Sequence, residues 1–243
     1  DLVRIAGLSH GTDVWLGNAQ QLIAEGKCTI SSAICTRDDI MVYLMDKGIE
    51  PQVSFDIMEH VRKGRGLLTY KDKETGEERQ EEDVMREHNV PEWYIWSCKK
   101  IKYMFPKAHA AAYVMMAWRV AYCKVFYPLA YYTAYFSIRA TAFDYEKMAM
   151  SPVRLEHYIA EYKAKKAEGT ISNTEEDELG VMRIVQEMHA RGYEFTPIDI
   201  YKAKARTFQI IDGKIMPSFK VISKVGEVAG ESIEIAARDG EFL

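Results

Sequence analysis

The spacing of apolar residues predicts short helices joined by turns over the first 63 positions. Apolar residues that recur every three or four positions mark one face of a helix. Three such helices are expected, at residues 14–24, 40–46 and 52–63. Pro51 opens the third, because proline fits a first helical turn. Residues 7–13 are polar and bracketed by glycines, so we expect a tight loop there.

Residues 64–83 lose this periodicity. They carry both signs of charge, and a Thr75-Gly76 turn lies between Lys71 and Glu78. This composition predicts a solvated, mobile loop or a small hairpin. The simplest interpretation is a surface insertion without a function of its own.

From Val84 to Arg191 the pattern is helical again. The expected helices lie at residues 91–103, 108–127 and 129–139, followed by two more between 144 and 191. The methionines and tyrosines of residues 113–136 recur at helical spacing, which is more typical of a core face than of a ligand platform.

After Gly192 the pattern becomes mixed. Two β-type runs over 208–216 flank Asp212-Gly213, a dipeptide typical of a two-residue hairpin turn. We therefore predict a mainly α fold, with a soft boundary near Gly192. The two expected parts are a helical domain over 1–191 and a small mixed module over 192–243.

Composition places limits on the class of protein. With 243 residues, 48% of them hydrophobic, the chain can build a sizeable core in one domain or two. The four cysteines fit neither a zinc pattern nor a disulfide framework, so we expect buried thiols in a reducing cytosol. No signal peptide is visible, and no run reaches the ~18 apolar residues of a membrane span. Because residue 1 is Asp and the last residues directly follow a helix-like run, we expect part of a longer protein.

Charge is distributed unevenly along the chain. Between Glu92 and Asp144 lie 51 residues without an acid, which hold seven lysines and arginines and 15 of the 28 aromatic side chains. The net charge of the whole chain is −4, which excludes a general polyanion binder such as a histone. A basic stretch interleaved with aromatics favours a polyanion with stackable bases, that is, a nucleic acid or a nucleoside triphosphate.

The centre of this basic stretch predicts a phosphate site. On a helix that runs to residue 103, Lys99 and Lys102 share a face. A helix opened by Pro106 has free N–H groups in its first turn, which attract phosphate. The candidate residues are Lys99, Lys100, Lys102, Lys107, His109, Tyr113 and Arg119. The alternative is a solvated lysine face beside an aromatic core, but the absence of neighbouring acids favours the phosphate site.

Other polar residues give weaker signals. His10 follows Ser9 without an acyl-transfer signature or metal-ligand spacing, so on sequence alone it is a loop-shaping polar residue rather than a base or ligand. The acids at 38–39 and 81–83 are interpreted as helix caps and solvated loop rather than as metal ligands.

Residues 221–230, followed by a helix, are similar to a helix–hairpin–helix element. Such elements bind DNA phosphates through the backbone N–H groups of a glycine-containing hairpin. Here Lys224 stands at the first glycine position and only Gly226 is kept. Contact with DNA stays open, since Lys224 can still meet a phosphate as a point charge.

Four longer motifs occur in a fixed order. They are GLSHGTDVWLGNA at 7–19, CTRDDIMVYL at 35–44, VPEWYI at 90–95 and CKKIKYMFPKAHAAAY at 98–113. This order resembles the PolC type of the bacterial DNA polymerase III alpha subunit, a C-family replicative polymerase of low-GC Gram-positive bacteria. The likeness extends over essentially the whole chain, although the charged stretch from Tyr70 to Glu82 looks longer than usual.

The resemblance implies that 1–191 is the helical fingers domain and that 192–243 is the truncated start of a duplex-DNA-binding module. It implies a cytoplasmic DNA-directed DNA polymerase that binds primer–template DNA and the incoming dNTP. It also places Ser9 and His10 near the incoming base, beside His109 and Tyr113.

In such an enzyme, Mg²⁺ is held by carboxylates of a palm that this chain does not include. We therefore expect no catalytic residue, metal ligand or cofactor here, and no activity of the chain alone. The implied partners are the palm and other domains of the same polymerase, and a sliding clamp reached through a C-terminal tail beyond Leu243.

Two other classes of protein are alternatives to this resemblance. A stand-alone helical DNA-binding or scaffold module would use the basic stretch for backbone contacts, bind DNA in a salt-sensitive way and ignore nucleotides. A membrane-surface protein fits poorly, because the basic residues do not lie opposite a purely apolar face.

Overall fold

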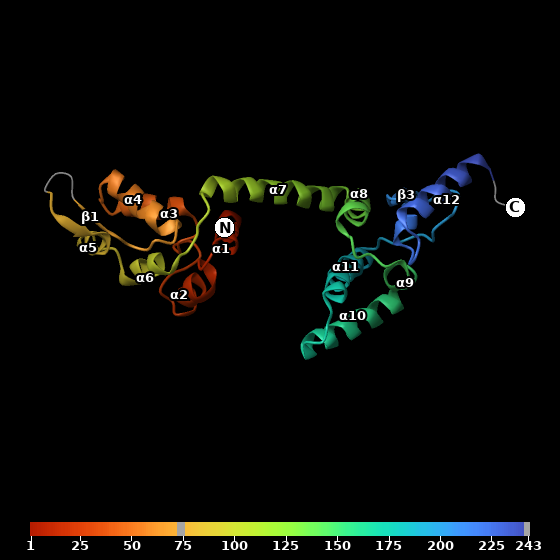
Figure 1. Ribbon diagram of the computed structural model, residues 1–243, viewed down its shortest axis with the longest axis horizontal. Helices are drawn as coiled ribbons and strands as arrows, with labels where there is room; N and C mark the ends of the chain where they lie inside the picture. Colours follow the sequence, from red (N-terminus) through yellow and green to blue (C-terminus); the bar gives the residue numbers. More distant parts are fainter. Residues whose placement is uncertain (72–75, 241–243) are drawn as a thin grey trace. The chain divides into compact units, whose positions relative to one another are not determined.

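The protein is mainly α-helical. A computed structural model describes residues 1–71 and 76–240 and contains, among these residues, two small antiparallel hairpins beside the helices (Figure 1). The predicted fold class is therefore confirmed. Contacts divide the chain into two compact units, Asp1–Arg119 and Val120–Leu243, which are described separately.

The first unit is built from short helices and one hairpin. Its elements are α1 (Leu2–His10), a π-helical turn (Trp15–Ala19), α2 (Gln20–Ala24), α3 (Arg37–Asp46), α4 (Pro51–Arg62), β1 (Thr69–Lys71), β2 (Glu78–Gln80), α5 (Glu81–Glu87), α6 (Glu92–Lys100) and the first part of α7 (Lys107–Phe126). Strands β1 and β2 pair with Tyr70 opposite Arg79. The predicted turn residue Thr75 lies outside the described residues.

The core of the first unit lies between α3, α4 and α6. Helices α3 and α4 pack side by side (Figure 1). Asp39 caps α3, because its carboxylate accepts hydrogen bonds from the backbone N–H groups of Cys35 (3.0 Å) and Thr36 (2.9 Å). The buried apolar side chains include Leu8, Ile40, Leu44, Ile57, Val61, Met85, Ile95, Ile101 and Met104.

Two expectations for the N-terminal region were wrong. Gly7 to His10 form the last turn of α1 rather than a loop. Gly7 is needed for close packing, since a Cβ there would lie 2.4 Å from the carbonyl oxygen of Cys35. The helix expected over 14–24 is interrupted, because Leu16 is extended and Gly17 has a φ of +64°.

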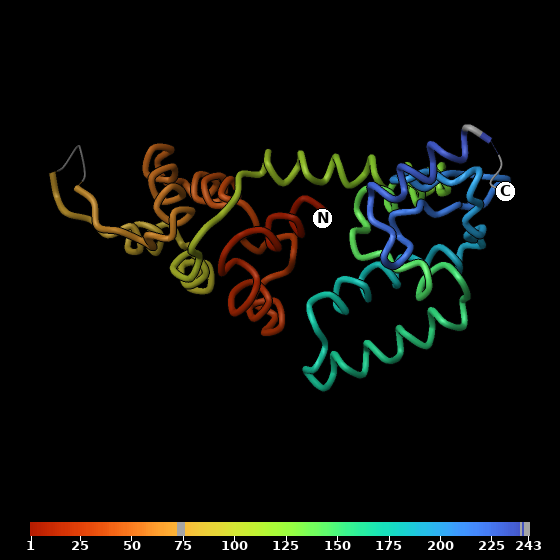
Figure 2. The backbone as a smooth tube through the Cα atoms, turned by 45° about the vertical axis from the view of Figure 1, so that its right-hand side comes forward, coloured from red at the N-terminus to blue at the C-terminus, as the bar shows by residue number. Residues whose placement is uncertain are grey.

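The second unit continues α7 and adds helices and a second hairpin. Its further elements are α8 (Pro128–Ala134), a π-helical turn (Tyr135–Arg139), α9 (Tyr145–Met148), α10 (Pro152–Glu168), α11 (Asn173–Ala190), β3 (Gln209–Ile211), β4 (Lys214–Met216), a 3-10 turn (Phe219–Val221) and α12 (Glu227–Asp239). Helices α10 and α11 pack as a pair joined by a short connection (Figure 2). Ser172 caps α11 in a capping box with Glu175. The hairpin predicted at Asp212-Gly213 is confirmed.

An aromatic core joins several parts of the second unit. Phe136 and Phe143 contact Phe208 with ring centroids 5.9 and 5.1 Å apart. Met188, which precedes Gly192, is buried in the same core as Phe208. This core therefore contains residues from both sides of Gly192, and contacts divide the chain after Arg119. The functional boundary near Gly192 stays a prediction.

The cysteines are all free, but they are not all buried. Cys28, Cys35 and Cys98 are buried as expected, whereas Cys123 is exposed. Burial raises the pKa of the Cys35 thiol to about 11, so this thiol is protonated at neutral pH. In the part of the chain that the structure describes, no helix has the length and apolar character needed to cross a membrane.

Candidate functional site

The segment after α6 is extended and pairs with the residues that follow α1. The backbone N–H of Thr12 donates to the carbonyl of Tyr103 (2.9 Å), and the N–H of Lys102 donates to the carbonyl of Thr12 (3.1 Å). This pairing ends α6 at Lys100. The prediction that Lys99 and Lys102 share a helix face was therefore wrong.

Four aromatic side chains from two distant parts of the sequence meet beside this pairing. The ring of His10 lies 6.5 Å from that of Phe105 and 5.9 Å from that of Tyr113. Phe105 stacks on His109 at 4.5 Å, and His109 lies 4.6 Å from Tyr113. We call His10, Phe105, His109 and Tyr113 the aromatic cluster. Tyr113 is 57% exposed, so the cluster is open to solvent.

Three members of this cluster, His10, His109 and Tyr113, are among the residues predicted from the sequence, whereas Phe105 is not. Phe105, His109 and Tyr113 recur every four residues, which is the spacing of one helix face. Phe105 was overlooked because it precedes Pro106 and thus lies before the predicted helix. Ser9 is exposed, and its hydroxyl donates to the carbonyl of Ala6 (3.2 Å).

Three of the candidate lysines line one cleft. This lysine cleft has a volume of about 370 Å³ and is lined by Asp13, Leu16, Gly17, Lys99, Lys100 and Lys102. Lys99 forms an ion pair with Glu82 (2.5 Å), and this hydrogen bond holds the pKa of Glu82 below its usual range. The expectation that no acid neutralises these lysines was therefore wrong for Lys99.

The other two lysines of the cleft have no acidic partner among the described residues. The ammonium of Lys100 donates to the carbonyl of Gly17 (3.1 Å) and lies 4.2 Å from the centroid of the Trp96 ring. Lys102 is exposed and makes no side-chain hydrogen bond or ion pair within the described part of the chain. These two ammonium groups remain available for an anion.

The first turn of α7 already has a carboxylate. Asp38 accepts a hydrogen bond from the backbone N–H of Lys107 at 2.6 Å. The side chain of Lys107 lines a separate pocket of about 250 Å³ with Arg4, Thr36 and Asp39. The expectation of a free, positive helix end at Pro106 was therefore wrong, because an acid from α3 occupies it.

Arg119 lies farther along the same helix. Twelve residues separate it from Lys107, which corresponds to ~18 Å along a helix axis. Its guanidinium has one polar neighbour in the described residues, the sulfur of Met116 at 3.8 Å. The structure thus does not bring Arg119 together with Lys107 around a single phosphate.

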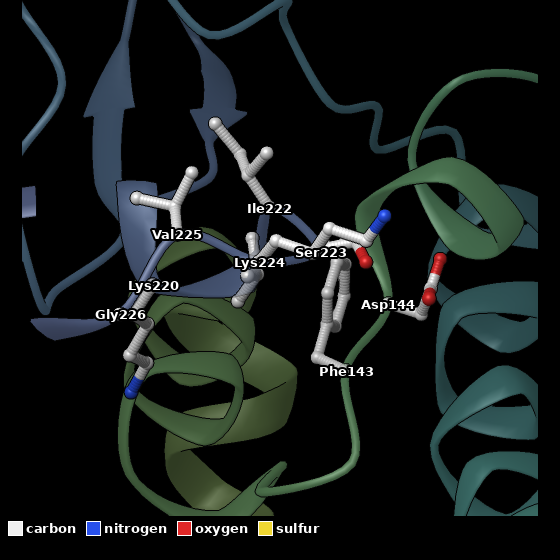
Figure 3. A pocket seen from close by; sticks show the side chains of 9 residues that line it. Phe143, Asp144, Lys220, Ile222, Ser223, Lys224, Val225 and Gly226 are labelled. Atoms are coloured by element: carbon white, nitrogen blue, oxygen red, sulfur yellow. The ribbon is translucent and has the colours of Figure 1, made fainter. Parts of the chain in front are cut away.

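The hairpin before α12 contains the two candidate DNA-binding residues. Lys224 has a φ of +67°, a left-handed conformation that favours glycine, and Gly226 is the N-cap of α12. Both line a pocket of about 470 Å³ with Phe143, Asp144 and residues 220–225 (Figure 3). Only a 3-10 turn precedes the hairpin, so the first helix of the expected helix–hairpin–helix element is a single turn.

Comparison with known proteins links this arrangement to a family. Residues 1–83 match the model of the bacterial DNA polymerase III alpha subunit finger domain. The whole chain is 49% identical to DNA polymerase III PolC-type from Streptococcus pyogenes serotype M2 (strain MGAS10270) and from serotype M5 (strain Manfredo). Over its whole length, the chain is therefore similar to one part of PolC-type DNA polymerase III. It spans 16% of the length of these relatives.

The candidate site includes residues inside and outside the match to the finger-domain model. His10, Glu82 and the cleft residues Asp13, Leu16 and Gly17 lie in the matched residues 1–83. Helices α6 and α7 follow the matched residues, but they lie within the alignment to the PolC-type relatives, which includes the whole chain. The extent of the fingers domain to residue 191 stays a prediction.

Proposed function

We propose that this chain is the fingers region of a longer replicative DNA polymerase and that it binds the incoming dNTP and primer–template DNA. The aromatic cluster carries this proposal. It brings His10, from the matched finger region, against His109 and Tyr113 of the basic stretch. An open cluster of aromatic rings, three of them from the basic stretch of the sequence, is suited to a nucleobase.

The proposed role is positioning and charge stabilisation. The rings hold a base by stacking, and the ammonium and guanidinium groups offset phosphate charge during nucleotidyl transfer, with no covalent step through this chain. The proposed phosphate-binding residues are Lys99, Lys100, Lys102, Lys107 and Arg119, with Ser9 beside the base. In this proposal Mg²⁺ belongs to the palm, and the palm, the sliding clamp and the DNA are partners of the full-length enzyme.

The Lys224 hairpin is proposed to contact DNA only weakly. Lys224 adopts the backbone conformation that the missing glycine would have, so the hairpin keeps its shape. The pocket beside it also contains Asp144, whose negative charge opposes a phosphate. We therefore assign it a supporting role in which Lys224 acts as a point charge.

The test is single-turnover incorporation by the full-length polymerase. His109→Leu and Tyr113→Leu should each lower the efficiency of dNTP incorporation roughly tenfold, because one stacked base is worth ~1–3 kcal/mol. Trp118→Leu is the matched control, since this side chain on the same helix is 66% exposed and outside the cluster. If all three variants lose incorporation efficiency equally, the proposal is overturned. DNA binding that does not change when dNTP is added would favour the scaffold module.

A further inference from the structure

The lysine cleft is a pocket with fixed walls. One wall is the segment of Asp13, Leu16 and Gly17 around the π-helical turn, and the other is the end of α6 with Lys99 to Lys102. The side chain of Asn18 is fully buried between them. Its amide donates to the carbonyls of Asp13 (2.8 Å) and Ser97 (3.3 Å).

Ser97 completes this link from the other wall. Its hydroxyl is 2% exposed as a residue and donates to the side-chain oxygen of Asn18 at 2.6 Å. The Lys100 ammonium adds a second link through the carbonyl of Gly17. Buried polar groups that are fully paired hold their surroundings in one arrangement. The backbone segments that carry the lysines of the cleft are thus joined in a rigid frame.

The charge of the cleft is modest. Its lining contains three lysines and one acid, Asp13, and Lys99 is already paired with Glu82. This leaves Lys100 and Lys102 as the cations open to a ligand, with the Asp13 carboxylate close by. A nucleoside triphosphate carries several negative charges on adjacent groups, whereas each phosphodiester of a nucleic-acid strand carries one. The cleft therefore matches one or two phosphodiesters better than a triphosphate.

The remaining lining fits a strand as well. Leu16 is 73% exposed at the edge of the cleft and offers an apolar surface to a sugar. None of the lining residues belongs to the aromatic cluster. We infer that the lysine cleft binds phosphodiesters of a nucleic-acid strand at a subsite separate from that of the incoming nucleotide. This inference rests on the proposed function and divides its phosphate-binding residues into two groups.

The inference is tested in the full-length polymerase with two readouts. Fluorescein-labelled primer–template with a single-stranded overhang is titrated by anisotropy over a range of salt concentrations, and the KM for dNTP is measured on the same DNA. The Lys100→Ala/Lys102→Ala double variant should raise the DNA Kd roughly tenfold and reduce the salt slope by about 1.4, or about 0.7 for each lost contact to a single strand. The KM for dNTP should rise much less. Lys27→Ala, an exposed lysine of the same unit, is the control.

A blunt duplex of equal length identifies the source of the phosphodiester. If the double variant loses affinity only for the overhang DNA, the cleft binds a single strand. If it loses affinity equally for both DNAs, the cleft binds the duplex backbone. A large rise in KM with unchanged DNA binding would overturn the inference while leaving the proposed function intact, because the lysines would then hold the triphosphate. If neither the DNA Kd nor the KM for dNTP changes, the inference is also overturned, and the lysines form a solvated surface. Failure of the proposed function is separate, since it would show as incorporation insensitive to His109 and Tyr113.

Discussion

The carboxylate of Asp38 lies 2.6 Å from the backbone nitrogen of Lys107 and accepts its hydrogen bond. Beside it, the backbone N–H of Arg37 donates to the carbonyl of Phe105 (3.2 Å). The start of α3 is thereby bonded to the start of α7, although 69 residues separate Asp38 from Lys107. This link fixes the position of Phe105, and therefore of the aromatic cluster, relative to α3.

Replacement of Asp38 should destabilise the first unit. Asp38→Ala leaves the N–H of Lys107 without its partner and removes a negative charge from the N-terminus of α7, so the free energy of unfolding should fall by about 1 kcal/mol. Asp38→Asn keeps a hydrogen-bond acceptor, so its free energy of unfolding should fall by less than that of Asp38→Ala. All four tryptophans lie in the first unit, so fluorescence during urea unfolding follows this unit alone. Asp46→Ala, at the other end of α3, should leave the midpoint unchanged or raise it slightly.

Gly7 and Gly180 should respond to alanine with opposite signs. A Cβ at Gly7 would lie 2.4 Å from the Cys35 carbonyl oxygen, so Gly7→Ala must displace α1 from α3 and should destabilise by ~1–3 kcal/mol. At Gly180, inside α11, a Cβ meets nothing within 4 Å. Gly180→Ala should therefore stabilise the second unit by ~0.5–1 kcal/mol. Circular dichroism during thermal unfolding measures both, and a destabilised Gly180→Ala would contradict this packing argument.

Much of the fold could be predicted from local patterns. Pro51 and Gly48 bound helices because their backbone preferences act within a few residues, and the turn at Asp212-Gly213 follows the same rule. Gly7 is the exception, since its small size serves a contact with Cys35 rather than a turn.

The candidate site was less predictable, because it depends on contacts between distant residues. Lys99 appeared unopposed in a stretch without acids, yet α5 brings Glu82 to it across the fold. Lys102 left its predicted helix because the segment after Lys100 pairs with Thr12. The spacing of His109 and Tyr113 is visible in the sequence, but the approach of His10 is not.

Glu59 should make the first unit sensitive to acid. The hydrogen bond from Arg62 and a second from Lys63 lower the pKa of Glu59 to about 2 from its ordinary value of 4.5, although burial opposes this shift. Because the folded-state pKa lies below the unfolded one, this stabilisation is complete above about pH 4.5 and is lost as the pH falls towards 2. The urea midpoint of the wild type should thus fall between about pH 5 and about pH 3, across the upper part of this window, by more than that of Glu59→Gln. Glu25→Gln should follow the wild type, and identical acid dependence of all three proteins would refute the role of Glu59.

Asn18 and Ser97 should be energetically coupled. Asn18→Ala removes the partner of the Ser97 hydroxyl and of the Asp13 carbonyl in a buried place, so it should destabilise the first unit by ~1–3 kcal/mol. Ser97→Ala leaves the Asn18 oxygen unpaired and should have a smaller effect of about 1 kcal/mol, because the other bonds of Asn18 remain.

The double variant separates the pair from its surroundings. Since both single variants break the same 2.6 Å hydrogen bond, the double variant should lose less than the sum of the two single losses, with a coupling of ~0.5–3 kcal/mol. Urea unfolding followed by tryptophan fluorescence gives all four free energies. Strictly additive losses would show that Asn18 and Ser97 do not act as one link between the walls of the lysine cleft, and the rigidity of that cleft would then need another source.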